Sequence, residues 1–329
     1  ILETLNVLFY LRSRNNGSAL ISVLILLAFA SSLLIVFLNI SKQDQKQINS
    51  FKKNNSILMQ LHAVEDFAIN ILNVDYQNSP NMTYRNENWG NSIPAFAVGT
   101  YSVSLDIEDL QSKLNINSLM RNASDINFIQ LERMISLFDQ LNINQDLLYA
   151  LIDWIDINSD MITAAGAEDN HYLNLNPPYR TANNYIENLD EILLIKGFDY
   201  KILKKLKPHI TAISHGSNIN INTVSNETIS FLHPMIGLIN SEKIIRQRNK
   251  SPFENRKDFA FFLKYDLRLS DSIINEVTSM ITTKSDNFRI HAKITKLDHS
   301  LQFSTNINHD LDVSQFVKHN RVIKKIESM

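Results

Sequence analysis

Residues 12–42 read RSRNNGSALISVLILLAFASSLLIVFLNISK, a short basic segment followed by an apolar run. No ionisable side chain occurs in residues 15–41, and residues 19–40 are almost entirely Leu, Ile, Val, Ala, Phe and Ser. An α-helix rises about 1.5 Å per residue, so this run can cross a hydrocarbon core of about 30 Å. Arg12 and Arg14 precede the run, which predicts a cytoplasmic N-terminus and an exported remainder.

The one site that looks cleavable is Gly17-Ser18, which lies before the apolar run. A basic leader, a glycine, a small residue and an apolar helix are arranged as in a type IV prepilin-like signal. That resemblance implies that a dedicated prepilin peptidase cuts after Gly17 and that Ser18 becomes the mature N-terminus. The alternative is an ordinary signal anchor that has a glycine in front of it.

The fifth position of the predicted mature chain is Ser22, where major pilins carry Glu. A carboxylate at bilayer depth costs on the order of 3 kcal/mol and needs a partner. In pilin-like fibres that partner is the N-terminal amine of the subunit ahead. A subunit with nothing ahead of it needs no such carboxylate, so Ser22 predicts a position at the tip of a fibre.

Composition limits the classes of function. The 329 residues carry 32 Lys and Arg against 34 Asp and Glu, a net charge of −2, which gives no basic field for nucleic acid. The sequence has no Cys, so disulfides, thiolate catalysis and Cys-based metal sites are excluded. It also has no zinc-protease, nucleophile-elbow, P-loop or dinucleotide-binding motif. We therefore predict a protein that is not an enzyme.

Beyond Lys42 the apolar residues keep a helical period on one face of the chain. These residues are Ile48, Phe51, Leu58, Leu61, Val64, Ala68 and Leu72. The pattern predicts one helix from Ser18 to about Asn73, and the turn-forming residues 78–81 (Asn-Ser-Pro-Asn) end it.

Two distant segments, 101–107 and 288–294, alternate apolar and polar residues with period two, as strands do. Leu301 and Phe303 predict a further strand. The residues between the two segments read as helices joined by short turns, so pairing of the segments would make residues 120–283 an insertion. Antiparallel strands tolerate such an insertion because closure entropy grows slowly with loop length.

An acidic segment follows an apolar helix that ends near Trp154. Asp156, Asn158 and Asp160 alternate with other residues, and Glu168 and Asp169 follow within one loop. Oxygen ligands at this spacing suit a hard cation such as calcium. The alternative is a solvated acidic loop.

The segment is not an EF-hand, because Met161 and Ala167 replace the glycine and the glutamate that such a loop requires. The preceding Asp153 is either a ligand or a residue that orients the end of the helix.

Several ordered blocks around this loop resemble the K-type minor pseudopilins of the bacterial type II secretion system. The matching blocks are LNINSL at 114–119, LIDWID at 151–156, GAED at 166–169 with Tyr172, NPPYRTAN at 176–183, LDEI at 189–192, IKG at 195–197 and ININT at 219–223. Together with the N-terminal signal that lacks Glu at mature position five, the resemblance covers nearly the whole chain.

The resemblance implies an α+β, pilin-like fold, with a long N-terminal helix, an antiparallel sheet and a large α-helical insertion that binds calcium. We expect Asp156, Asp160, Glu168 and Asp169 to be carboxylate ligands, with Asn158 a weaker candidate.

The expected domains are a leader (1–17), a transmembrane helix (18–41), a pilin-like part (42–119), the insertion (120–283) and a closing pilin-like part (284–329).

The function that the resemblance implies is that of a structural minor pseudopilin at the tip of the pseudopilus, which initiates or caps fibre assembly for protein export. Expected partners are minor pseudopilins of the I and J types, the prepilin peptidase and the inner-membrane assembly platform, with secreted substrates or the outer-membrane channel as further contacts. The expected location is the inner membrane, in a single pass with a periplasmic C-terminal domain, and the expected modifications are peptidase cleavage and methylation. A minor pilin of a type IV pilus is an alternative.

Residues 220–262 resemble a helix-hairpin-helix unit, which in other proteins exposes backbone N–H groups to a DNA phosphate. Here Met235 replaces the first hairpin glycine and Gly237 stands at the second, although basic residues follow at Lys243, Arg246, Arg248 and Lys250. We expect a structural hairpin and no nucleic-acid partner. A membrane-anchored DNA-binding module is the second alternative.

Overall fold

The computed structural model describes residues 2–91, 93–213, 217–296, 299–310 and 312–326, with side chains left undescribed at 2–19, 49–54, 296, 299 and 324–326. By its internal contacts the chain divides into two units, Ile1–Ala63 and Val64–Met329. Helix α1, Leu2–Asn78, runs through both. It begins earlier than predicted because residues 2–12 are mostly good helix formers. It ends two residues before Pro80, which has no N–H to donate.

Part of α1, Leu20–Ile48, is long and apolar enough to cross a membrane, with a mean hydropathy of 2.9. Its large apolar side chains are exposed, as lipid-facing side chains are. The hydroxyls of Ser31 and Ser32 donate to the backbone oxygens of Leu27 and Phe29, both at 2.7 Å. These bonds satisfy the serine hydroxyls within the helix, so the serines are tolerated in an apolar span.

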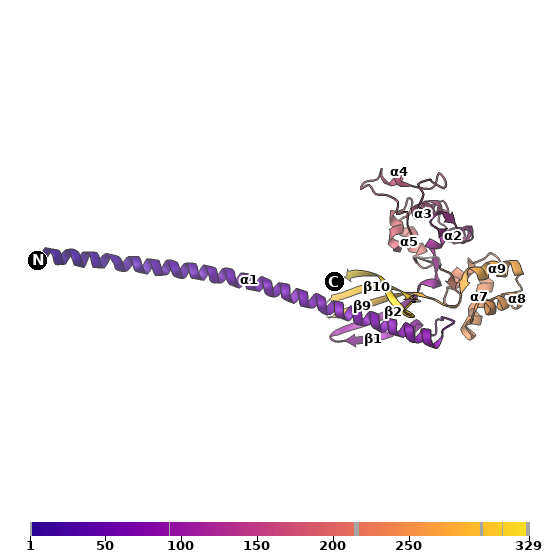
Figure 1. Cartoon of the computed structure of the whole chain (residues 1–329), viewed down its shortest axis with the longest axis horizontal. Coiled ribbons are helices and arrows are strands. Elements are labelled where there is room, and N and C mark those ends of the chain that lie inside the picture. The colour runs from indigo at the N-terminus through magenta and orange to yellow at the C-terminus, as the bar shows by residue number, and fades with distance from the viewer. Residues whose placement is uncertain (1, 92, 214–216, 297–298, 311, 327–329) are drawn as a thin grey trace. The chain divides into compact units, whose positions relative to one another are not determined.

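The second unit contains a five-stranded antiparallel sheet in the order β1-β2-β9-β10-β11 (Figure 1). Its strands are β1 Ile93–Val98, β2 Tyr101–Asp109, β9 Asn287–Lys296, β10 His299–Asp310 and β11 Gln315–Ile326. The predicted pairing of two distant strands is confirmed, since Val103 lies opposite Ile294 and Ile107 opposite Ile290. The α+β fold class is also confirmed.

Residues 64–78 of α1 pack on one face of this sheet. Buried Glu65 accepts hydrogen bonds from Thr305 Oγ1 of β10 (2.6 Å) and from Arg321 Nε of β11 (2.7 Å). Farther along the helix, the Tyr76 ring stacks on His309 with 4.0 Å between ring centroids. The sheet and the end of α1 thus share a core that contains both apolar contacts and a buried ion pair.

Between β2 and β9 the chain forms the helical insertion, whose helices gather in two groups (Figure 1). One contains α2 Phe128–Gln140, α3 Leu147–Ile155, α4 Asp169–Tyr172 and α5 Tyr200–Leu206, and the other α7 Gly237–Lys250, α8 Arg256–Tyr265 and α9 Asp271–Ser279; α6 is Asn226–Ser230. The 3-10 helices are η1 Asn88–Gly90, η2 Leu110–Ser112, η3 Ile116–Leu119 and η4 Leu189–Leu194. One hydrophobic core extends through both groups.

The insertion also contains short strand pairs that the sequence did not predict. Parallel pairs join β3 Leu114–Asn115 to β6 Ile210–Thr211, and β7 Ile219–Asn220 to β8 Ile281–Thr282. An antiparallel pair joins β4 Met120–Asn122 to β5 Asp125–Ile126. Two or three residues are too few to show a period of two, so these strands leave no pattern in the sequence.

A buried carboxylate joins the insertion to the sheet. Asp109, the last residue of β2, accepts hydrogen bonds from Thr223 Oγ1 (2.5 Å), Ser285 Oγ (2.7 Å) and the Gln111 backbone N–H (2.8 Å). Thr223 belongs to the insertion, and Ser285 lies where the chain returns to the sheet. The Asp109 side chain therefore bonds to residues at the start, the middle and the end of the insertion.

Candidate functional site

The predicted acidic site lies in the loop between α3 and α4. The α3 side chains Leu148, Leu151 and Ile152 are at most 1% exposed, which fixes the helix end against the insertion core. Trp154 is also buried, and its Nε1 donates to Glu191 Oε1 at 2.9 Å. The carboxylates that follow are thus held by a rigid helix end.

Asp153 organises the loop. Its two carboxylate oxygens accept backbone N–H bonds from Ile162 (3.1 Å) and Ala167 (2.9 Å). Gly166 lies so close that a Cβ there would be 1.9 Å from Asp153 Oδ2. Of the two roles left open by the sequence, this geometry supports the one in which Asp153 orients the chain.

Lys196 also contacts this loop, and the sequence did not predict that contact. Its Nζ donates to the backbone oxygen of Gly166 at 2.9 Å. Lys196 is 30 residues away in the chain, so local spacing gave no signal of this contact. Gly166 was a visible signal, because a loop glycine often marks a close approach of the chain.

Asp156 and Glu168 are brought together with oxygens that have no hydrogen-bond partner. Their side chains are 2% and 4% exposed, and Asp156 Oδ1 and Glu168 Oε1 and Oε2 are buried and unpartnered. Burial, with the charge of Asp153 second, raises the pKa of Asp156 to about 6. Burial, followed by the charges of Asp153 and Asp156, raises the pKa of Glu168 to about 7.

The other three predicted ligands are placed differently. Asn158 and Asp160 are exposed, and Asn158 donates from Nδ2 to Asp156 Oδ2 at 2.9 Å. Asp169 is already partnered, by Arg180 Nη1 at 2.6 Å and by the Thr181 hydroxyl at 3.0 Å. In the part of the chain that the structure describes, no three His, Asp or Glu side chains are grouped so that they could hold a metal ion.

Two of the predicted ligands, Asp156 and Glu168, still fit a hard cation. Buried carboxylate oxygens without partners are costly, and a cation or donated hydrogen bonds would relieve that cost. Asp156 and Glu168 supply such oxygens in the chemistry that calcium prefers. The loop can thus accept a cation through two carboxylates, with Asp160 and Asn158 a few residues away in the chain.

The hairpin that resembles a DNA-binding unit is built from α6, α7 and the turn between them. Gly237 adopts a positive φ of 52°, which suits a glycine at the start of α7. Arg248 is buried and donates to the Ile221 backbone oxygen at 2.7 Å, while Arg246 pairs with Glu242 at 3.1 Å. Both arginines already have protein acceptors, and this agrees with a packing role for the hairpin.

The predicted processing residues lie inside α1. The backbone at Gly17 and Ser18 is helical, and their side chains are outside the part that the structure describes. Cleavage between these residues stays a prediction.

Comparison with known proteins agrees with the resemblance that the sequence shows. The family model described as "Type II secretion system (T2SS), protein K" matches residues 112–215. Type II secretion system protein K of Aeromonas hydrophila is 26% identical over 264 residues, which covers 74% of this chain and 79% of the relative. Protein K of Pseudomonas aeruginosa is 27% identical over 263 residues, with 76% and 77% covered.

A solved structure extends the likeness to the fold. A chain of the GspK-GspI-GspJ complex from enterotoxigenic Escherichia coli superposes with a TM-score of 0.72 at 19% identity, and the match covers 86% of this chain and 100% of that chain. The resemblance to K-type minor pseudopilins is therefore confirmed.

Proposed function

We infer that this chain is a K-type minor pseudopilin of a type II secretion system, and we propose that it works at the tip of the pseudopilus. There it initiates or caps the fibre that serves protein export across the outer membrane. The observation that carries the proposal is the shared fold: a long helix and antiparallel sheet, interrupted between β2 and β9 by a helical insertion. The role is structural, and no enzymatic step is part of it.

The N-terminal part of α1 serves as the anchor in this proposal. Its apolar segment, Leu20–Ile48, suits a single pass of the inner membrane before assembly. The basic residues Arg12 and Arg14 favour a cytoplasmic N-terminus, so the sheet and insertion are periplasmic. The prepilin peptidase cuts between Gly17 and Ser18, and the new N-terminus is methylated.

The bulk of the insertion supports the proposed tip position. After β2 the chain leaves the sheet and returns to it only at β9. The helices of this insertion form a hydrophobic core of their own. Such a body does not fit between neighbours along a packed fibre, whereas the tip leaves one side open. Ser22 agrees, because a tip subunit has no N-terminal amine ahead of it to neutralise.

The proposed partners are minor pseudopilins of the I and J types and the inner-membrane assembly platform, with secreted substrates or the outer-membrane channel as further contacts. The matched Escherichia coli structure is a complex of GspK with GspI and GspJ, which supports the I-type and J-type proteins as partners.

The tip assignment can be tested by labelling the insertion in assembled pseudopili. An epitope placed after Lys250, an exposed residue at the end of α7, keeps the core intact. Antibody-gold confined to one end of each fibre is the expected result in electron micrographs. Gold distributed along the fibres would contradict the tip position.

Calcium is the proposed ligand of the α3–α4 loop, held by Asp156 and Glu168. Asp160, Asn158 and Asp169 belong to the same segment of the chain and are further candidate ligands. The ion would neutralise two buried carboxylates and stabilise the native state, because a ligand that binds only the folded protein shifts the folding equilibrium. The support is the set of unpartnered buried oxygens on Asp156 and Glu168.

We expect the paired change Asp156→Ala and Asp160→Ala to abolish any rise of the melting temperature on adding calcium. The matched control is Asp312→Ala, since Asp312 is an exposed acid in the β10–β11 turn. Identical melting of the native protein with calcium and with a chelator would contradict the calcium proposal.

A further inference from the structure

The face of the sheet opposite α1 carries a row of polar side chains. In strand register, Glu108 of β2 lies opposite Arg289 of β9, Arg289 opposite Asn306 of β10, and Asn306 opposite Asn320 of β11. Alternation along each strand puts the apolar neighbours, such as Ile290, on the other face. The row is therefore a continuous polar strip across four strands.

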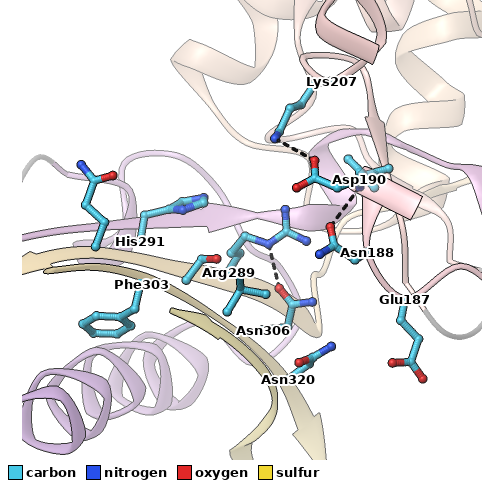
Figure 2. Close-up of a pocket in the computed structure, with 13 residues that line it drawn as sticks. Glu187, Asn188, Asp190, Lys207, Arg289, His291, Phe303, Asn306 and Asn320 are labelled. Carbon is cyan, nitrogen blue, oxygen red and sulfur yellow. Dashed lines mark hydrogen bonds and ion pairs between the residues drawn. The ribbon is translucent and has the colours of Figure 1, made fainter. Parts of the chain in front are cut away.

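A cavity of about 200 Å³ lies between this strip and the insertion (Figure 2). On the insertion side it is lined by residues 187–190 and Lys207. Asp190 and Lys207 also line a second cavity of about 350 Å³, which shares Lys113 with a third of about 430 Å³. The first two cavities both border on Asp190 and Lys207, and together we call them the sheet–insertion groove.

Arg289 is the cation at the centre of the first cavity. Its Nε donates to Asn306 Oδ1 at 2.7 Å, the contact drawn in Figure 2. Among the described residues no carboxylate lies within ion-pairing distance of its guanidinium. The cross-strand neighbour Glu108 instead bonds His291 Nε2 at 3.1 Å and pairs with Lys113.

The nearest acids act on this guanidinium through their charge and do not bond it directly: desolvation lowers its pKa, and the charges of Glu108 and Asp190 oppose that shift. The Arg289 side chain is half-buried. The two acids that line the cavity do not bond it, because Asp190 pairs loosely with Lys207 at 3.7 Å and Glu187 is exposed to solvent. A desolvated cation without a bonded anion favours an external carboxylate.

We propose that the sheet–insertion groove binds an extended acidic segment of a protein partner, whose carboxylate is held by the terminal nitrogens of Arg289. The planar guanidinium suits a bidentate bond to a carboxylate, and Lys207 and Asn320 offer further donors on either side. Beyond Lys207 the second cavity adds Lys113 and Lys204 to the lining, which suits a longer acidic segment rather than a small solute. The proposal goes beyond the assignment to a pseudopilus and does not depend on it.

The test uses the full chain in detergent and two dye-labelled probe peptides, Gly-Glu-Gly-Glu-Gly and its glutamine counterpart Gly-Gln-Gly-Gln-Gly. Fluorescence anisotropy should show saturable binding of the acidic peptide, and at least tenfold weaker binding of the glutamine peptide. Arg289→Gln should weaken binding of the acidic peptide at least tenfold, and Lys207→Gln by a smaller factor. Arg246→Gln is the matched control, because Arg246 is an exposed arginine on α7 outside the groove.

The melting temperature of each variant establishes that it is folded, and Lys207→Gln replaces Arg289→Gln in the test if the latter unfolds. Equal loss of binding in Arg289→Gln and Arg246→Gln would overturn the proposal, because it would show unspecific attraction. Binding of free glutarate as tightly as the acidic peptide would also overturn it, because a small solute would then be the better occupant.

Discussion

Gly166 is the residue on which the candidate cation loop depends most directly. A methyl group there would lie 1.9 Å from Asp153 Oδ2, and Asp153 would have to give up its backbone bonds to Ile162 and Ala167. We expect Gly166→Ala to lower the free energy of unfolding by about 2 to 4 kcal/mol, as measured by urea denaturation.

Gly237→Ala is the matched control for this change. A Cβ at Gly237 meets no atom within 4 Å, so only its positive φ of 52° opposes the substitution. Its expected cost is about 1 kcal/mol. Equal costs at the two glycines would show that Asp153 is free to move and does not organise the loop.

Glu87 predicts a pH dependence of stability. It is buried, accepts hydrogen bonds from Trp89 Nε1 (2.8 Å) and the Tyr84 N–H (3.1 Å), and burial raises its pKa to about 7. The native carboxyl therefore binds its proton more tightly than the unfolded one does. Its stabilising contribution is complete below the ordinary pKa of 4.5 and is lost as the pH rises towards 7.

Glu87→Gln keeps an oxygen acceptor but cannot ionise, so this loss should disappear. Relative to the native protein, the variant should gain about 2 kcal/mol of stability between pH 5 and pH 8. Urea unfolding of both proteins at the two pH values measures this change. A stability difference that is the same at pH 5 and pH 8 would contradict the assignment.

At the scale of elements, the end of α1 is held to the edge of the sheet by a buried ion pair. Glu65 is fully buried, and Arg321 of β11 donates to it from Nε (2.7 Å) and Nη2 (2.5 Å). Burial by itself would raise the pKa of Glu65, but the hydrogen bonds from Arg321, Thr305 and Lys318 hold it below its usual range. Removing one partner would leave a charge in the core without its main compensation.

Arg321→Gln should therefore destabilise the protein by about 3 kcal/mol in thermal or urea unfolding. Arg246→Gln breaks an exposed pair with Glu242 and should cost less than about 0.5 kcal/mol. If the two variants lose similar stability, the buried pair does not hold the helix to the sheet.

Most of the large elements could be predicted from the sequence because their apolar residues repeat over many positions. The period of two in 101–107 and 288–294 predicted strands that pair in the structure, and the apolar stripe beyond Lys42 predicted the continuation of α1. The start of α1 at Leu2 could not be predicted from the apolar run, which begins only after Gly17. The two-residue strands β3, β6, β7 and β8 could not be predicted, because their parallel pairing depends on contacts far along the chain.

The candidate site could be predicted in composition but not in arrangement. The sequence identified the acidic loop and ranked Asn158 as the weaker candidate, but it could not separate the four carboxylates from one another. The structure separates Asp156 and Glu168, which are buried and have unpartnered oxygens, from Asp169, which is bound by Arg180 and Thr181. That difference is decided by tertiary contacts such as Asp153 with Ala167, which no local pattern reveals.

At the scale of the whole molecule, each unit has its own role in the proposed function. The unit Ile1–Ala63 contains the apolar segment that would hold the chain in the membrane. The unit Val64–Met329 contains the sheet, the insertion, the acidic loop and the sheet–insertion groove. A minor pseudopilin with this organisation is expected to form a complex of defined composition with its partners.

The most direct test is the mass of the particle that forms when the full chain is purified in detergent with the I-type and J-type minor pseudopilins proposed as its partners. Multi-angle light scattering, corrected for bound detergent, gives the protein mass of each eluting species. We predict one stable complex of defined mass that contains all three proteins. Elution of this chain alone, with α1 intact and the other two proteins folded, would contradict its assignment as a minor pseudopilin.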